Sequence, residues 1–261
     1  MNVPAVLVPL DGSVAAAAAL PVGQGLALAL GAPLQVIHVS EPVLPADEAD
    51  RRLGSGADVT FTAAGDPAVA ILAAAHPGTH IVMSRHCGHP RVAGLGAVAE
   101  RVLRAFTGPV VLVPPDRGEA PWEPRALVLP LDGTPASACA VPPACHLANA
   151  TGGTVLLLHV ADAPARLDAE SGTFGAPRYT DQPQHEWPAW RDEFAERAAY
   201  GCSTNVRVEL VAGSPAQVAV RAASEADLVV VGWHGVLDGH AAVLRALLQE
   251  ARCPVMVVRA G

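Results

Sequence analysis

The sequence contains no lysine, and all 17 of its basic residues are arginine. This absence excludes a P-loop lysine, a Schiff-base lysine and a lysine general base. Acidic residues number 25 and the net charge is −8, so the chain lacks the basic surface that attracts a nucleic-acid backbone. We therefore expect no nucleic-acid partner and no lysine-dependent enzyme chemistry.

Cysteine is scarce, odd in number and never spaced as CxxC, at Cys87, Cys139, Cys145, Cys202 and Cys253. Without a signal peptide, this pattern indicates reduced thiols and a cytoplasmic location. The uncharged run at residues 14–30 is mostly alanine and is interrupted by Pro21, Gly23 and Gly25. Alanine contributes little to membrane transfer, so we interpret this run as a buried helix and expect no membrane partner.

Much of the sequence occurs twice, as similar segments that follow one another in the same order. The segment VLVPLDGS at residues 6–13 returns as LVLPLDGT at residues 127–134. The segment THIVMSRHCG at residues 79–88 aligns with ADLVVVGWHG at residues 226–235. Three further segment pairs follow the same order: 33–40 with 154–161, 62–68 with 210–216, and 108–114 with 253–259. Such internal similarity predicts two copies of one structural unit.

The intervals between motifs also repeat. Asp11 precedes His38 by 27 positions, and Asp132 precedes His159 by the same 27. Short continuous runs of Val, Ile and Leu alternate with helix-length stretches, which is typical of parallel strands covered on both faces. The expected strands are 4–10, 34–39, 58–63, 79–84 and 109–113, then 126–131, 154–160, 205–211, 226–232 and 254–258. The pattern predicts an α/β protein with two doubly wound, parallel five-stranded sheets in tandem.

The repeats set the domain boundaries. We expect a first domain at residues 1–115, a proline-rich linker at 116–125 and a second domain at 126–261. The second repeat is longer after its second strand, which indicates an insertion at about residues 162–188. Aromatic residues such as Trp187 either cover a crevice as a lid or pin a long loop to the body.

Polar residues follow the first strand of each repeat. Asp11-Gly12-Ser13 and Asp132-Gly133-Thr134 fall where a doubly wound sheet binds ligands, at the carboxyl ends of its strands. Each carboxylate is suited to accept hydrogen bonds from an amine or a ribose hydroxyl, and the following helix N-terminus is suited to meet a phosphate. The alternative is that each triplet is only a tight turn and a helix cap.

These motifs together resemble the universal stress protein family, with two such domains in one chain. The resemblance rests on V-x-x-P-x-D-G-[ST], the His-containing second strand, the G-[DS]-P-A turn, the segment at residues 99–104 and the final CPVMVV. It implies an adenine-nucleotide α-hydrolase-like fold with strand order 3-2-1-4-5. It also implies pairing through the fifth strands, here between the two halves as an intramolecular pseudo-dimer, with a homodimer left open.

In nucleotide-binding members of that family, residues after the strands surround ATP or AMP. The resemblance places these positions at Pro9, Asp11, Gly12, Ser13, Val39, Met83, Gly96 and Ala97 in the first repeat, and at Asp132, Gly133, Thr134, Val160, Gly232 and Gly235 in the second. The family's phosphate loop has the pattern G-2x-G-9x-G-[ST]. Here the first repeat lacks the two early glycines and the hydroxyl, whereas the second shortens the loop and lacks the final Gly-Ser.

Each lost glycine or hydroxyl would weaken phosphate binding by about 1–3 kcal/mol. We therefore expect a non-catalytic stress-response or interaction module with degenerate phosphate loops and an unidentified protein partner. The alternative is an adenine-nucleotide sensor that binds ATP or AMP through at least one domain.

Other motifs carry weaker alternatives. His86-Cys87-Gly88-His89 matches the H-x-G-H signature of some nucleotidyltransferases, but it follows the fourth strand rather than the first. The neighbouring histidines would suit a metal, although their spacing favours an incidental role, and we assign no metal site. Cys87 would be redox-sensitive if Arg85 or His86 stabilised its thiolate. His38 and His159 are interpreted as core residues, and no catalytic arrangement is recognisable, so we expect no enzyme.

Overall fold

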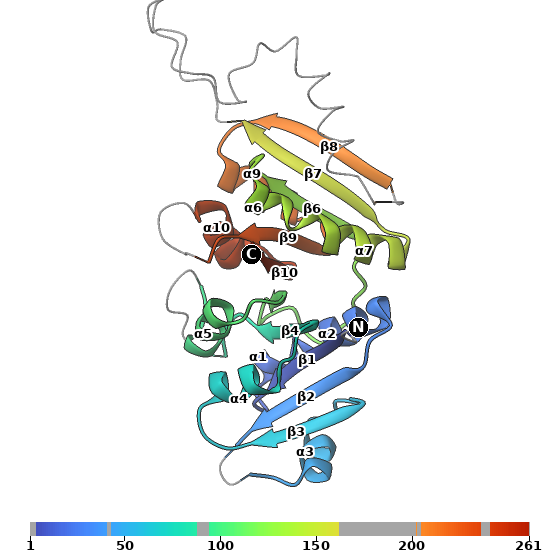
Figure 1. Cartoon of the computed structure of the whole chain (residues 1–261), viewed down its shortest axis with the longest axis vertical. Coiled ribbons are helices and arrows are strands. Elements are labelled where there is room, and N and C mark those ends of the chain that lie inside the picture. Colours follow the sequence, from blue (N-terminus) through green and yellow to red (C-terminus); the bar gives the residue numbers. More distant parts are fainter. Residues whose placement is uncertain are drawn as a thin grey trace, which may run out of the picture.

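Strands alternate with helices in the computed structural model, which describes residues 4–40, 43–87, 94–161, 202, 205–235 and 241–260 (Figure 1). The elements of the first half are β1 Ala5–Leu10, α1 Val14–Ala17, α2 Leu20–Leu30, β2 Leu34–Val39, α3 Ala46–Leu53, β3 Val59–Ala63, α4 Pro67–Ala74, β4 Thr79–Ser84, α5 Ala97–Ala105 and β5 Val110–Val113. Those of the second half are β6 Ala126–Leu131, α6 Pro135–Ala138, α7 Val141–Thr151, β7 Thr154–Ala161, β8 Asn205–Ala212, α9 Pro215–Ala223, β9 Leu228–Trp233, α10 Ala242–Glu250 and β10 Val255–Arg259.

The strand positions expected from the apolar runs agree with these bounds to within two residues. The alanine-rich run forms two helices, α1 and α2, rather than the single helix expected. Pro67 begins α4, and the side chain of Asp66 caps this helix by accepting a hydrogen bond from the Val69 N–H at 3.1 Å. Ser214 occupies the same position before α9 but makes no side-chain cap. The expected insertion at 162–188 lies outside the described residues.

The ten strands found among the described residues form one continuous sheet, in the order β3-β2-β1-β4-β5-β10-β9-β6-β7-β8. The expectation of two separate five-stranded sheets is therefore wrong. Each half does have the order 3-2-1-4-5, counted from its own first strand, and its neighbouring strands are parallel. β5 and β10 pair antiparallel, with Met256 opposite Val111. Each would otherwise be an edge strand with unpaired backbone groups, and their pairing fuses the two sheets.

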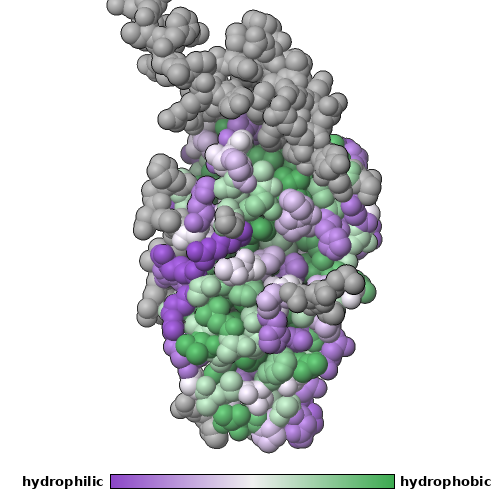
Figure 2. Space-filling model, viewed as in Figure 1, coloured by the Kyte–Doolittle hydropathy of each residue, from purple (hydrophilic) through white to green (hydrophobic). Residues whose placement is uncertain are grey.

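Apolar side chains fill both faces of the sheet. One cluster lies under α4, α5, α9 and α10 and includes Ile71, Leu103 and Leu247 from both halves. The other lies under α1, α2 and α7 and includes Leu26 and Leu147. Figure 2 shows hydrophobic residues spread over the lower part of the molecule, which the first half of the chain forms.

The two halves hold each other through reciprocal contacts around β5 and β10, a region that we call the seam. The buried guanidinium of Arg85, after β4, donates to carbonyl oxygens at the end of α10: Leu248, Leu247 (3.4 Å) and Ala251 (2.9 Å). Arg259, at the end of β10, donates to the Arg104 carbonyl oxygen near the end of α5 at 2.9 Å. An arginine from each half thus satisfies carbonyl groups that a helix of the other half leaves without partners.

A disulfide joins Cys145 of α7 to Cys202, which precedes β8. The expectation that all five cysteines are reduced is therefore wrong for this pair. Their 57-residue separation hides the pairing in the sequence, and only packing on one sheet face brings them together. Cys87, Cys139 and Cys253 are free thiols.

No helix among the described residues is long and apolar enough to span a membrane.

Candidate functional site

Two crevices open at the carboxyl ends of the strands, one in each half. The first lies at the ends of β1 and β4, and the second at the ends of β6 and β9. In each half the first strand lies between two others: β1 between β2 and β4, and β6 between β7 and β9. The strand order therefore reverses at β1 and at β6, where the crevices lie. Doubly wound sheets bind their ligands at such points.

The first crevice has a cavity of about 320 Å³. Of the residues singled out from the sequence, Pro9, Asp11, Val39, Met83, Gly96 and Ala97 line it, whereas Gly12 and Ser13 do not. Its remaining wall is mostly apolar and is formed by Leu10, Ala16, Ile37, Pro67, Ile71, Val98 and Ala99, with Ser84, His86 and Cys87 as further polar groups. A ligand here would meet one carboxylate and a largely hydrocarbon surface.

The second crevice is larger, with a cavity of about 420 Å³. Of the residues singled out from the sequence, Asp132, Val160 and Gly232 line it, whereas Gly133, Thr134 and Gly235 do not. Sequence reasoning missed several of its other residues, among them Ser137, Trp233 and His234. The tryptophan and histidine do stand in the sequence between the two expected glycines.

Both aspartates sit in the turn-and-cap arrangement that the sequence left open as an alternative. Gly12 has φ +82°, a left-handed conformation that favours glycine. The Ser13 N–H donates to Asp11 Oδ1 at 2.9 Å, and Ser13 Oγ accepts from the Ala16 N–H at 3.1 Å. Asp11 nevertheless lines the cavity. The turn therefore fixes a carboxylate at the crevice wall, so its turn role and a ligand role are compatible.

Asp132 accepts two hydrogen bonds from the next residue but one, Thr134. The Thr134 N–H donates to its Oδ1 at 2.9 Å, and the Thr134 hydroxyl donates to the same oxygen at 2.7 Å. Partial burial alone would raise the pKa of Asp132, but hydrogen bonds from Ser137 and Thr134 outweigh it and lower the pKa below its usual value. Asp132 is therefore a carboxylate at neutral pH.

In the first half, the loop expected to hold phosphate makes other contacts. The Gly96 N–H donates to the Arg85 carbonyl oxygen at 2.8 Å. The Ser84 hydroxyl donates to the His86 carbonyl oxygen at 3.0 Å. The Arg85 side chain is buried in the seam, where it caps α10 instead of facing the cavity. The Arg85 guanidinium is therefore committed to the other half.

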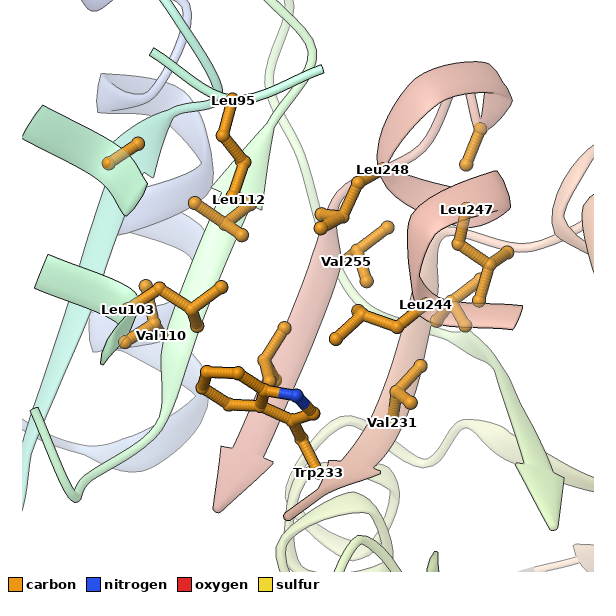
Figure 3. Packing of buried hydrophobic residues seen from close by; sticks show 14 of the residues in the cluster. Leu95, Leu103, Val110, Leu112, Val231, Trp233, Leu244, Leu247, Leu248 and Val255 are labelled. Atoms are coloured by element: carbon orange, nitrogen blue, oxygen red, sulfur yellow. The ribbon is translucent and has the colours of Figure 1, made fainter. Parts of the chain in front are cut away.

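In the second half, the expected glycines serve close packing. A Cβ on Gly232 would lie 2.2 Å from the Ala136 carbonyl oxygen, so the strand and the start of α6 approach too closely for any side chain. Gly235 has φ +91°, and its Cα faces the Arg259 guanidinium. Between them, Trp233 is buried and points across the seam toward Leu103 and Val110 of the first half (Figure 3).

His159 is buried, as expected of a core histidine, whereas His38 is only partly buried. Nδ1 of His38 lies 2.9 Å from the Leu10 carbonyl oxygen, and Nδ1 of His159 lies 2.9 Å from the Leu131 carbonyl oxygen. Each ring therefore ties the end of its second strand to the end of the first, directly before the aspartate. The repeated 27-residue interval reflects this contact.

Cys87 does not have a stabilised thiolate. Burial and the nearby Asp11 carboxylate raise the pKa of the Cys87 thiol, while Arg85 is turned away from it. No group of three or more metal-ligating side chains occurs in the described ranges, which omit His89 of the histidine-rich loop. The H-x-G-H motif falls partly outside those ranges at Gly88 and His89.

Comparison with known proteins identifies relatives of both the sequence and the fold. A family model described as "Universal stress protein family" matches residues 124–259, just over half of the chain. A curated universal stress protein of Mycobacterium tuberculosis (strain H37Rv) is 29% identical over 193 residues, which cover 69% of this chain and 58% of the relative. The chain thus matches less than two thirds of the length of that relative.

Solved structures with the same fold span the whole chain. A universal stress protein from Archaeoglobus fulgidus aligns over 100% of both chains with a TM-score of 0.69 and 19% identity. A functionally unknown protein from Pseudomonas aeruginosa aligns over 99% of this chain and 93% of its own, with a TM-score of 0.67 and 16% identity.

Proposed function

This chain belongs to the universal stress protein family, and from that membership we propose that it is a tandem member acting as a non-catalytic stress-response module. In this proposal its two domains occupy residues 1–115 and 126–261, with residues 116–125 as linker. Each half repeats the strand order, the aspartate turn and the contact between histidine and carbonyl oxygen. In this proposal the protein acts in the cytoplasm by binding a protein partner through its surface.

One observation carries the proposal: the residues at the phosphate-loop positions contact the protein itself. Gly96 donates its N–H to Arg85, Gly232 packs against α6, and Arg85 and Trp233 are buried in the seam. Phosphate binding depends on free backbone N–H groups and on glycines that allow a close approach. At the described positions of both loops, the glycines make contacts within their own half, and the Arg85 and Trp233 side chains contact the other half.

The absence of catalysis is part of the proposal. The polar side chains lining the first crevice are Asp11, Ser84, His86 and Cys87, and the Ser84 hydroxyl is directed to a backbone carbonyl group. The thiol has a raised pKa, which disfavours the nucleophilic thiolate. The Thr134 hydroxyl contacts a carboxylate, but it also accepts the Ser137 N–H as the cap of α6, so its contacts are those of a turn and a helix cap.

The first test is to denature protein purified without added ligand and to analyse the supernatant by mass spectrometry. The proposal expects no stoichiometric ATP, and calorimetry with ATP and Mg²⁺ should show no saturable heat at millimolar nucleotide. Stoichiometric ATP in the supernatant, or micromolar binding, would overturn it.

A second candidate function is sensing of a small adenylate such as AMP in the first crevice. Asp11 lies on one wall, and the N-terminus of α5 lies on another without a side-chain cap. A ligand with hydroxyl donors at one end and an anion at the other would match both. Calorimetry with adenosine, AMP and ATP tests this candidate: binding of AMP that is lost in Asp11→Asn supports it, whereas no binding, or binding unaffected by Asp11→Asn, rejects it.

A further inference from the structure

The outer edge of the sheet differs between the two halves. β3 and β8 are the terminal strands of the ten-stranded sheet. β3 has the sequence VTFTA, without charge, proline or glycine, and its Val59 and Phe61 are large hydrophobic residues with 41% and 37% of their surface exposed. Proteins usually protect an edge strand with charges, proline or a bulge, because its unpaired backbone groups can recruit another strand.

The edge strand of the second half has that protection. Phe61 pairs in register with Ile37, and the matching position in β8, opposite Leu158, is Glu209. Two residues earlier, Val59 corresponds to Arg207. The same topology thus carries an apolar edge at one end of the molecule and a charged edge at the other.

The backbone of β3 is available on its outer side. Within the described part of the chain, β3 pairs only with β2, and its alternation directs the N–H and C=O groups of Val59 and Phe61 away from β2. Among the described residues, neither of these two residues makes a backbone hydrogen bond outside the β2 ladder. α3 contacts β3 through the other side chains of the strand, since Thr60 donates to Asp50 of that helix at 3.3 Å.

We propose that β3 pairs antiparallel with β3 of a second copy of this chain and forms a homodimer with a twenty-stranded sheet. The sequence of the strand is nearly the same in both directions, so a two-fold axis at Phe61 sets Phe61 against Phe61, Thr60 against Thr62 and Val59 against Ala63. Such a self-complementary patch is what a two-fold interface requires. Aromatic and β-branched cross-strand pairs stabilise it.

The molecule already contains a junction of this kind. β5 and β10 join the two halves antiparallel, edge to edge, and the helices on each face continue across the seam. A β3 pair would repeat that geometry between chains. Because the strand has only five residues, we expect a concentration-dependent dimer rather than an obligate one.

The experiment measures the mass of the full chain by light scattering after size exclusion, over a dilution series. Wild type should shift from dimer to monomer on dilution. Phe61→Glu, which copies the residue found at the matching position of β8, should weaken dimerisation by about tenfold or more. Val14→Glu is the matched control: Val14 is 84% exposed on α1, which packs against β1 and β4, and its substitution should leave the dimer unchanged.

A second readout identifies the interface and does not depend on Phe61→Glu folding. Hydrogen exchange of wild type should slow at the Val59 and Phe61 amides at high concentration, with no change at Thr60 and Thr62, whose amides point to β2. A protein that stays monomeric at every concentration would overturn the proposal. So would a dimer that folded Phe61→Glu leaves intact, or a dimer without protection at Val59 and Phe61.

Discussion

The two halves share a topology but hold it with different chemistry. In the first half, Gln24 of α2 donates to the Ser55 carbonyl oxygen at 3.2 Å and so ties the helix to the segment before β3. In the second half, Cys145 occupies the matching place in α7 and is bonded covalently to Cys202 before β8. The strand pattern sets where the tether is needed, and the local residues decide how strong it is.

The loops after β4 and β9 show a similar divergence. Ser84-Arg85 and Gly232-Trp233 occupy equivalent positions, and in both halves the second residue is buried in the seam. The arginine satisfies backbone carbonyl groups, whereas the tryptophan supplies apolar contact. Two unlike side chains thus serve one purpose, which is to join the halves at the place where the family resemblance predicts a phosphate loop.

The largest expected effect on the free energy of unfolding distinguishes Gly232 from Ser84, which occupies the equivalent position in the first half. Gly232→Ala would place a Cβ against the Ala136 carbonyl oxygen, a backbone atom that cannot move without shifting α6. We expect it to lower the free energy of unfolding by about 3 kcal/mol or more. Ser84→Ala at the equivalent position should cost only about 1 kcal/mol, because it removes one hydrogen bond to His86. Urea unfolding followed by circular dichroism measures both, and equal losses would contradict the assigned packing role of Gly232.

The next largest expected effect compares the tethers of the two halves, the Cys145–Cys202 disulfide and the hydrogen bond from Gln24 to Ser55. Cys145→Ser should lower the free energy of unfolding by about 2–4 kcal/mol, since the disulfide closes a long loop. Gln24→Ala should cost about 1 kcal/mol. Reductant should destabilise wild type by as much as Cys145→Ser does and should leave that variant unchanged. If reductant destabilised both proteins equally, the disulfide would not be the tether.

Most strand positions could be predicted from the sequence, because continuous apolar runs and repeated intervals indicate the strands and their order directly. The strand at 79–84 and the 27-residue interval between Asp11 and His38 are examples, since each follows from local pattern alone. The fusion of the sheets, the Cys145–Cys202 bond and the capping of α10 by Arg85 could not be predicted in this way. They depend on residues far apart in the sequence that meet only after packing.

The same limit applies to the crevices. Asp11, Asp132 and Val39 could be located because they lie at or directly after the ends of strands that meet at one edge of the sheet. The roles of Gly96 and Gly232 could not, since a glycine that admits a ligand and one that admits a helix look identical in sequence. Only the contacts of the Gly96 N–H and of the Gly232 Cα distinguish the two cases.

The smallest expected effect compares the two aspartate turns. Thr134 donates both its N–H and its hydroxyl to Asp132, whereas the equivalent Ser13 donates its N–H to Asp11. Asp132→Asn should therefore cost more stability at neutral pH than Asp11→Asn, although the difference should stay below about 1 kcal/mol because the carboxylate is partly solvated.

The pH dependence should reveal the same difference. The pKa of Asp132 is lower in the folded protein than its usual 3.8, so its contribution is fully present above that value and is lost as the pH falls through the folded pKa. Urea titrations from neutral pH down to about pH 3 should show that the difference in unfolding free energy between wild type and Asp132→Asn becomes smaller as the pH falls. A difference in unfolding free energy that stayed constant or grew would mean that the hydrogen bonds of Asp132 do not stabilise its charged form. The turn of the second half would then be no stronger than that of the first.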